Sequence, residues 1–386
     1  MDFRLGEEAE EVRAELRAFL EGFMTPEREE QLYRSGTSHD PEFSKAVVEH
    51  RWLGAAWSKE DGGHGRDPRV LSPIREEYGF FDAPTYATSV TLMIANTIRR
   101  VGTPEQKAEI LPKALKGEIV IVLGFTEPES GSDVAAAQTK AMRDGDEWII
   151  NGQKMFTTNA HVADYAFLVT RTNPDVAKHK GLTMFLVPLD QPGVEVQPVY
   201  TLSGERTNIT FYNDVRVPDT LRIGDVDGGW RVMTVALQDE HSGGYGHRMR
   251  RLLHDVERWA EDAVDHEGRP RKDDPDVRAR IARFAADTEV AILLERRANW
   301  MNHEGMVPEA EGPMAKLFSS EAFSRGVQDI VELIGPDALR SYFEPSAPVN
   351  GKIEHTLRFS LGTTIYAGTS EVQRNIIAQR GLGLPR

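Results

Sequence analysis

The sequence predicts an α+β protein in which helices come first, a β domain follows and helices then return. Three observations support this order. Apolar residues recur at helical spacing through the first part of the chain. Short runs rich in β-branched and aromatic residues, separated by turn signals, begin near Val120. Helical spacing resumes after Gly228-Gly229. We therefore expect a helical domain at residues 1–120, a β domain at 121–227 and a helical domain at 228–386.

The first domain contains several helical patterns. One face of the first helix is formed by apolar residues at helical spacing, namely Leu5, Ala9, Val12, Leu16, Phe19 and Phe23. This helix is expected to end at Thr25-Pro26. Further helical patterns cover residues 41–52, 75–78 and 89–101. Thr103-Pro104-Glu105 is typical of an N-cap and first turn, and it predicts a helix through Leu115.

The middle of the chain has the pattern of a sheet. The expected strands are residues 147–151, 165–171, 182–187, 194–200 and 208–217. Asp144-Gly145 and Asn151-Gly152 favour tight reversals. Short strands with little helix between them predict a small antiparallel barrel or sandwich. After this domain, long amphipathic patterns at residues 278–301 and 313–334 and a shorter one at 371–380 predict helices.

Composition and charge exclude several classes of function. The chain has 386 residues, 40% of them hydrophobic, and a formal net charge of −15, which argues against nucleic acid or an anionic membrane as the main partner. It has no cysteine, so disulfides, iron–sulfur clusters and a thiol nucleophile are excluded. The N-terminus is acidic and the longest apolar run, residues 119–125, is short, so we expect a cytoplasmic protein without membrane insertion. The spacing of His50, His64 and His161 does not suggest a metal site.

The segment Gly124-Phe-Thr-Glu-Pro-Glu-Ser-Gly-Ser-Asp133 carries the first chemical signal. Its hydroxyls and glycine-flanked backbone can approach a flat ring or a phosphate closely. A polar loop leading into a β domain would have the same composition, so the pattern alone leaves both interpretations open.

Four blocks together resemble the acyl-CoA dehydrogenase family. They are Thr126-Glu-Pro-Glu-Ser-Gly-Ser-Asp133, Trp148-Ile-Ile-Asn-Gly-Gln-Lys-Met-Phe-Thr-Thr-Asn159 with Ala163-Asp-Tyr165, Asn213-Asp-Val-Arg-Val-Pro218 with Gly229-Trp230, and Tyr366-Ala-Gly-Thr-Ser-Glu-Val-Gln-Arg374. The resemblance implies the acyl-CoA dehydrogenase fold, with a helical N-terminal domain, a central antiparallel β-barrel and a C-terminal four-helix bundle. It implies an oxidoreductase of lipid metabolism that uses FAD, forms a homomeric or heteromeric dimer or tetramer, and passes electrons to electron-transferring flavoprotein.

The resemblance also implies site residues. Flavin contacts would come from Leu123, Phe125, Thr126, Gly131, Ser132, Phe156, Thr158, Thr369 and Glu371, and acyl-CoA contacts from Ser132, His241, Tyr366 and Gly368. In place of the Trp that is common there, Phe156 can still stack on a flavin.

The catalytic base is expected at Glu240. Removing an α-proton requires a carboxylate close to that carbon. Many relatives carry the base in the C-terminal signature, where this chain has Ala367, and alanine cannot accept a proton. A second group of relatives, resembling isovaleryl-CoA and long-chain dehydrogenases, carries it on the first bundle helix, where Glu240 stands, followed by His241 in place of the usual Arg. Asp239 is the neighbouring competitor, about 100° away around the helix.

A further departure leaves the role of the chain open. The usual Arg-x-x-Phe-Gly block, which reaches the FAD of a partner subunit, is replaced by His266-Glu-Gly-Arg-Pro-Arg-Lys-Asp-Asp274. Arg269, Arg271 or Lys272 could substitute for its charge, or the segment is a basic surface loop. Heteromeric dehydrogenases of steroid-derived thioesters show similar departures.

Two other functions therefore stand beside dehydrogenation: a flavin-dependent monooxygenase on the same fold, and a non-catalytic subunit that completes another subunit's site. The acyl group is not determined. Gly243 and Gly244, just after the expected base, could make room for a wide acyl chain or mark a helix kink.

Overall fold

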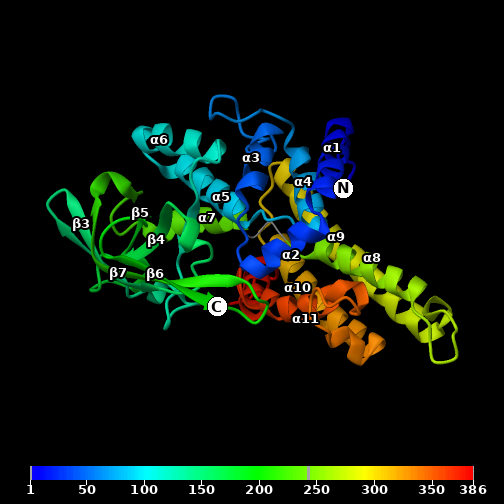
Figure 1. Ribbon diagram of the computed structural model, residues 1–386. Coiled ribbons are helices and arrows are strands. Elements are labelled where there is room, and N and C mark those ends of the chain that lie inside the picture. Colours follow the sequence, from blue (N-terminus) through cyan, green and yellow to red (C-terminus); the bar gives the residue numbers. More distant parts are fainter. Residues whose placement is uncertain (1, 241–243, 386) are drawn as a thin grey trace. The chain divides into compact units, whose positions relative to one another are not determined.

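The structure is a computed structural model that describes residues 2–240 and 244–385, without the side chains of residues 238–240. Contacts divide the chain into two compact units. The sheet unit holds residues 31–67 and 84–240, and the bundle unit holds the described parts of residues 1–30, 68–83 and 241–386. Figure 1 shows the elements of both units. The three-domain division expected from the sequence stays a prediction.

The sheet unit contains a mostly antiparallel sheet. Its strands are β1 (Ile121–Gly124), β2 (Lys140–Asp144), β3 (Glu147–Lys154), β4 (Tyr165–Arg171), β5 (Leu182–Pro188), β6 (Val194–Tyr200), β7 (Arg206–Pro218) and β8 (Arg222–Ile223). They follow the order β6-β7-β3-β2-β4-β5-β8, and β1 pairs in parallel with β4. Within the described residues β6 and β8 do not pair, so the sheet is open and the expected antiparallel barrel does not close.

The sequences of β4 and β5 are apolar without alternation, and the burial of the two strands explains this. Both are buried along nearly their whole length, which means that both faces are covered. Phe167 and Met184 face a core formed with the helices, whereas Leu168 and Phe185 face a second core with β3 and β7. Trp148 of β3 lies 5.3 Å from Phe185, measured between ring centroids. The sheet therefore curves over its own side chains, which is how an open sheet obtains a buried second face.

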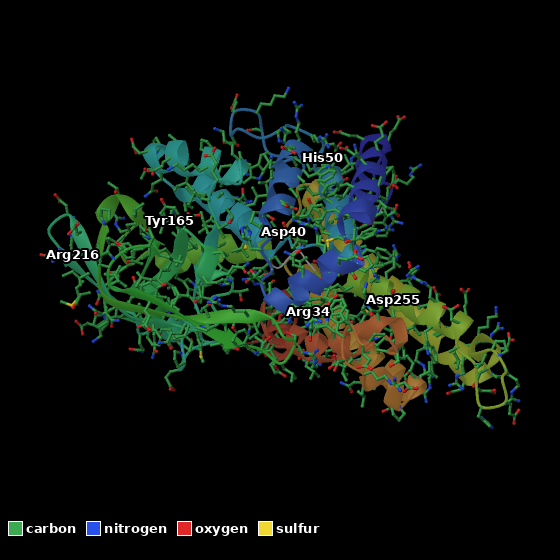
Figure 2. All side chains as sticks on the ribbon, in the orientation of Figure 1. Arg34, Asp40, His50, Tyr165, Arg216 and Asp255 are labelled. Atoms are coloured by element: carbon green, nitrogen blue, oxygen red, sulfur yellow. The ribbon has the colours of Figure 1, made fainter. Side chains whose placement is uncertain are left out.

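Four helices lie wholly in the sheet unit, and two of them begin with local caps. They are α3 (Pro41–Glu49), α5 (Tyr86–Val101), α6 (Pro104–Leu115) and α7 (Gly229–Glu240). Asp40, labelled in Figure 2, accepts the backbone N–H groups of Glu42 and Phe43 at the start of α3. Thr103 and Gln106 form a reciprocal capping box at α6, which confirms the expected helix start.

The bundle unit is helical. Its elements are α1 (Glu7–Phe23), α4 (Leu71–Phe81), α8 (Gly246–Asp262), α9 (Pro275–His303), α10 (Glu311–Ile334), α11 (Lys352–Thr363) and α12 (Ser370–Ile376). The helices α8, α9, α10 and α11 form the expected four-helix bundle around Met249, Phe284 and Phe323. The expected helices at residues 278–301 and 313–334 lie inside α9 and α10.

One helix was missing from the sequence prediction. The pattern ends the first helix at Thr25-Pro26, yet Pro26 is the first residue of α2 (Pro26–Ser35), which extends across both units. Proline is tolerated at the first helical position because its missing N–H would have no partner there. The Thr25 hydroxyl accepts the Arg28 N–H at 3.3 Å and so helps to start the new helix.

Candidate functional site

The loop after β1 contains most of the expected flavin contacts of the sheet unit. Leu123, Phe125 and Thr126 are partly buried, and Gly131 and Ser132 are exposed. The loop closes through two backbone hydrogen bonds between Glu127 and Ser130, at 2.9 and 3.1 Å. A Cβ added at Gly131 would come within 4.0 Å of Thr126 Cγ2 alone, so this backbone faces open space. The loop can therefore bring main-chain donors close to a ligand.

A buried ion pair ties this loop to the end of β3. Lys154 Nζ, in a side chain with 0% exposure, donates to Glu127 Oε1 at 2.7 Å. Glu127 also accepts the N–H groups of Gln138 and Thr139, at 2.6 and 2.9 Å. Burial opposes the charge on Glu127, but Lys154 and the two N–H donors outweigh it and lower the pKa of the carboxyl. Burial lowers the pKa of Lys154 to about 8, with the nearby carboxylate opposing the shift.

The turn after β3 presents an exposed aromatic ring. Phe156 has a positive φ of 58°, which is uncommon for a bulky residue, and its side chain is 55% exposed. The adjacent Met155 N–H donates to the Thr126 carbonyl at 2.8 Å, so the turn and the β1 loop are fixed together. Thr158 shares a hydrogen bond with the Thr207 hydroxyl at 3.0 Å. A rare backbone conformation that exposes an apolar ring suits stacking on a flat ligand.

The segment before α3 forms hydrogen bonds with the end of this turn. Asn159 is fully buried, with a φ of 64°. Its side chain donates to the Ser38 hydroxyl at 3.2 Å and accepts from the Thr37 hydroxyl at 3.4 Å. Residues far apart in the sequence therefore fix the conformation of the Phe156 turn.

The other expected contacts that the structure describes lie in the bundle unit, between the end of α11 and the first turn of α12. Tyr366 is 44% exposed, and Ala367 and Gly368 have positive φ values of 54° and 80°. The buried Lys316 of α10 donates to the Gly368 carbonyl at 2.6 Å. Thr369 caps α12 by accepting the Val372 N–H at 3.3 Å. The backbone N–H and the Thr369 hydroxyl at the start of α12 lower the pKa of the exposed Glu371.

The expected base occupies the last residue of α7. The backbone of Glu240 is helical, but its side chain and that of Asp239 lie outside the described part of the structure, as does the whole of His241. At the alternative position, Ala367 offers only a methyl group.

The basic loop is paired locally. Arg269 forms ion pairs with Asp265 and Glu267, and Arg271 pairs with Asp274 and lies over the Trp259 ring. These contacts agree with the interpretation as a surface loop, because both arginines that could bind a pyrophosphate already have partners.

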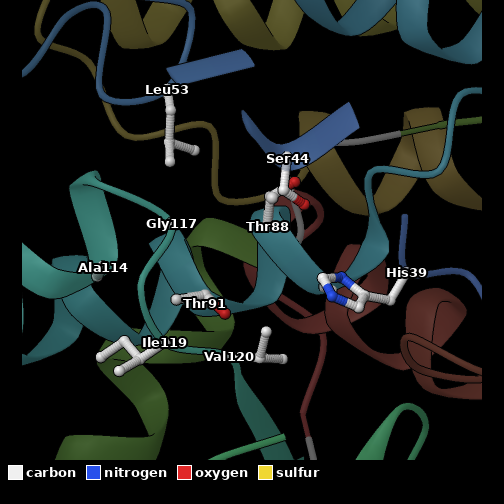
Figure 3. A pocket seen from close by; sticks show the side chains of 10 residues that line it. His39, Ser44, Leu53, Thr88, Thr91, Ala114, Gly117, Ile119 and Val120 are labelled. Atoms are coloured by element: carbon white, nitrogen blue, oxygen red, sulfur yellow. The ribbon is translucent and has the colours of Figure 1, made fainter. Parts of the chain in front are cut away.

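A small cavity in the sheet unit is lined by α3, α5, α6 and the segment before β1 (Figure 3). Its volume is about 10 Å³, enough for roughly one water molecule. In its wall, Thr91 accepts the Ile121 N–H at 2.9 Å and so fixes α5 to the start of β1. The cavity is too small for an acyl chain.

Glu127 and Lys154 both lie inside the sequence motifs, but the motifs alone assign neither residue a role. The signal was present, because Lys154 lies on the same alternating face of β3 as Trp148 and Ile150, which are buried. A lysine on an inward face predicts a buried anionic partner.

The described parts of the structure contain neither a metal-binding cluster nor a helix that could span a membrane. Among the side chains that the structure describes, which leave out those of residues 238–243, no three or more His, Asp or Glu are arranged to hold a metal ion. Among the described helices, none is both long and apolar enough to cross a membrane.

Comparisons with known proteins agree along the whole chain. Residues 6–118, 122–215 and 227–382 match the N-terminal, middle and C-terminal domains of acyl-CoA dehydrogenases. Acyl-CoA dehydrogenase FadE26 of Mycobacterium tuberculosis is 34% identical, over 98% of this chain and 97% of its own.

Two solved structures are similar over the full length of both chains, each with 34% identity. They are the Tcur3481-Tcur3483 steroid ACAD, with a TM-score of 0.92, and the ChsE4-ChsE5 complex from M. tuberculosis, with a TM-score of 0.91. This chain belongs to the acyl-CoA dehydrogenase family of oxidoreductases.

Proposed function

We propose that this chain oxidises the Cα–Cβ bond of an acyl-CoA thioester and passes the electrons to FAD. The observation that supports this most directly is the Phe156 turn, fixed to the β1 loop by the Met155–Thr126 hydrogen bond and the Lys154–Glu127 pair. In a member of the acyl-CoA dehydrogenase family, this arrangement fits one side of a flavin.

The residues present fit FAD. The exposed ring of Phe156 offers an apolar surface for a flat heteroaromatic ring, and the open backbone at Gly131 offers N–H donors without side-chain bulk. We propose that Leu123, Phe125, Thr126, Ser132 and Thr158 also contact the flavin, as do Thr369 and Glu371. Bound FAD supplies a two-electron acceptor for the β-hydrogen, which leaves as hydride.

The proton chemistry is assigned to Glu240. Its carboxylate would take the α-proton and hold it as a carboxylic acid, so that the substrate loses one proton and one hydride and becomes an enoyl thioester. Ala367 cannot perform this step. His241, Ser132, Tyr366 and Gly368 are proposed to contact the acyl-CoA.

We propose a polycyclic, steroid-derived acyl group as the first substrate class to test. The support is similarity to a protein described as a steroid ACAD, at 34% identity across both full chains. Gly244 gives no independent support, because an added Cβ there would lie 2.3 Å from Glu295 Oε1. The space beside Gly244 is therefore occupied by side chains of the bundle unit.

We also propose that the chain works with like or unlike subunits and with electron-transferring flavoprotein as acceptor. One similar structure is described as a complex of two unlike chains. The local pairing of Arg269 and Arg271 is in keeping with a pyrophosphate contact made by other residues.

The decisive experiment is an anaerobic titration of the purified protein with short, branched, long and steroid side-chain CoA thioesters. Bleaching of the flavin absorption band by one class establishes dehydrogenation and identifies that class. A bound flavin that no thioester bleaches favours the monooxygenase, since that group reacts with oxygen through reduced flavin. Purification without flavin, restored by a co-expressed partner, favours the non-catalytic subunit.

The base assignment has its own test. Glu240→Gln should lower turnover by about 10²–10⁴-fold while FAD and ligand binding persist, because a general base contributes roughly this factor. Asp239→Asn is the matched control and should retain turnover. Near-normal turnover of Glu240→Gln would show that the base lies elsewhere.

A further inference from the structure

The turn between α11 and α12 has an uncommon backbone conformation at two successive residues. Ala367 and Gly368 have φ values of 54° and 80°, both in the region that favours glycine. An alanine at such a φ is strained, and a strained residue persists only where its surroundings hold it in place. The conformation of this turn therefore depends on contacts from other parts of the bundle unit.

Two buried side chains of the same unit supply these contacts. Lys316 of α10 is 3% exposed, and its Nζ donates to the Gly368 carbonyl at 2.6 Å. Gln373 of α12 is 0% exposed, and its Nε2 donates to the carbonyls of Ala367 and Gly368, at 3.0 and 3.4 Å. A Cβ added at Gly368 would lie 2.6 Å from Gln373 Nε2, so only glycine allows this approach. Both carbonyls therefore point toward buried donors.

The fixed carbonyls determine where two N–H groups point. In a trans peptide bond the N–H lies opposite the C=O. The Gly368 N–H shares a peptide bond with the Ala367 carbonyl, so it points away from Gln373. The Thr369 N–H points away from Lys316 for the same reason. Among the described residues neither N–H finds an acceptor, so two adjacent main-chain donors are available to a ligand.

The charge of Lys316 strengthens one of these donors. A carbonyl oxygen that accepts a hydrogen bond from an ammonium group becomes polarised, and the polarisation extends through the peptide bond to its N–H. The peptide bond between Gly368 and Thr369 is in this situation, because Lys316 Nζ lies 2.6 Å from its oxygen. The Thr369 N–H is therefore the stronger of the two donors.

We propose that Lys316 and Gln373 are positioning residues, which aim the two N–H groups of this turn at oxygen atoms of a bound ligand. The proposal rests on the proposed function, in which Gly368 contacts acyl-CoA and Thr369 contacts FAD. Both ligands carry carbonyl and phosphate oxygens, which are acceptors for adjacent main-chain N–H groups. Lys316 and Gln373 are themselves buried, so they act through the backbone rather than by touching the ligand.

The test compares the parent protein with Lys316→Met, Gln373→Leu and Gln328→Leu. The first two variants remove a donor to the turn and keep a side chain of similar size. Gln328 lies on α10, is exposed and bonds to Ser324 of its own helix, so Gln328→Leu is the matched control for loss of an amide. Fluorescence titration of the apoprotein measures the Kd for FAD. Anaerobic titration of the FAD-loaded protein measures the Kd for a steroid side-chain CoA thioester.

We expect Lys316→Met to raise the Kd for at least one of the two ligands about tenfold, which corresponds to about 1.4 kcal/mol. Gln373→Leu should raise the same Kd about threefold, because a neutral amide is a weaker donor than an ammonium group. Lys316→Arg keeps a charged donor and should restore most of the affinity, whereas Gln328→Leu should bind as the parent does. The ligand whose Kd rises is the one that the turn contacts.

Hydrogen–deuterium exchange gives a readout that needs no ligand. The Ser370 N–H donates to the Thr364 carbonyl at 3.0 Å and so closes the turn. Once the carbonyls of the turn lose a donor, this bond should open more often. The peptide covering residues 364–374 should therefore exchange faster in Lys316→Met than in the parent, and at the parent rate in Gln328→Leu.

The outcomes separate this proposal from the proposed function. If Lys316→Met and Gln373→Leu are less stable but keep the parent's Kd for both ligands, the two side chains are only structural, and the positioning role is overturned even if the parent is a dehydrogenase. If Lys316→Met does not fold, Gln373→Leu decides by the same criterion. If the parent binds neither FAD nor any thioester, the proposed function fails and the ligand role of the turn fails with it.

Discussion

Glu127 in the sheet unit and Glu295 in the bundle unit are both buried glutamates, with 6% and 8% exposure, yet their pKa values shift in opposite directions. Burial disfavours the charged form of each. At Glu127, a buried lysine at 2.7 Å and two backbone N–H groups outweigh that cost and lower the pKa. At Glu295, burial dominates and raises the pKa to about 7, against the Gly246 N–H that partly offsets it.

The difference shows that burial makes the charged form of a carboxyl group costly, whereas its hydrogen-bond and ion-pair partners decide whether the charged or the neutral form is stable. Near Glu295, Arg296 bonds to Glu76, and the negative charge of Glu76 further raises the pKa of Glu295. His247, the nearest basic side chain, is itself buried, which lowers its pKa to about 4. One carboxyl group therefore acts as half of an ion pair, whereas the other is about half protonated at pH 7.

The sharpest test of this comparison removes the cation. Lys154→Met leaves the Glu127 charge buried without its partner, so we expect a loss of about 3–5 kcal/mol in the free energy of unfolding. Guanidinium denaturation at pH 7 measures it. The double variant Lys154→Met with Glu127→Gln removes the stranded charge and should recover part of the loss. A change below about 1 kcal/mol in the single variant would contradict the pairing.

The second test uses pH and the neutral analogue Glu295→Gln. The pKa of Glu295 is raised from 4.5 to about 7 on folding, so its stabilising contribution is present below pH 4.5 and is lost as pH rises through 7. The stability of the parent relative to Glu295→Gln should therefore fall over this range, by on the order of 3 kcal/mol. His247 acts in the opposite direction between pH 4 and 6.5 and lies 3.7 Å from Glu295, so the fall above pH 6.5 is the part that reports on Glu295 alone.

Glu127 should show the reverse behaviour. Its folded pKa is lowered, so its contribution is present above pH 4.5 and is lost as pH falls through the folded pKa. Relative to Glu127→Gln, the parent should therefore lose stability in acid. The same slope for both glutamates would refute the comparison.

The sequence predicted what depends on local pattern. Helical spacing located α9 and α10, and Thr103-Pro104 marked the start of α6, because caps and apolar faces are local signals. Closure of the sheet could not be predicted in this way, since the pairing of β2 and β4 joins strands distant in the chain. The start of α2 was missed because Pro26 serves equally well to end a helix or to begin one.

The same distinction between local signals and contacts of distant residues applies to the candidate site. The loop after β1 and the Phe156 turn were recognised from their motifs, and their backbone contacts now give each a conformation. Glu295 had no sequence signal, because its partners Gly246 and Ser319 lie on other helices and a single Glu in an amphipathic pattern suggests an exposed residue. Gly244 was open to two interpretations until its contact with Glu295 was known.

A smaller effect is expected from the glycine side of the same contact. Gly244→Ala would place a methyl group against Glu295 and Ser319, and such overpacking should cost about 1–3 kcal/mol. Gly22 in α1 is the matched control, because an added Cβ there meets nothing within 4 Å. Gly22→Ala should be neutral or stabilise by up to about 1 kcal/mol, since alanine favours the helix. Equal stability of the two variants would indicate that the backbone at Gly244 is not held by Glu295.

The smallest effect on the free energy of unfolding should come from breaking ion pairs that are exposed. Arg216 of β7, labelled in Figure 2, bonds to Glu147 and Asp144 at 2.9 Å, and the three side chains are 45–54% exposed. Water already stabilises these charges, so Arg216→Ala should lower the free energy of unfolding only slightly, and less at high salt. Denaturation at low and high salt measures both. Because these distances are close to the 2.7 Å at Lys154, a loss as large as that of Lys154→Met would mean that distance, rather than burial, decides what an ion pair contributes.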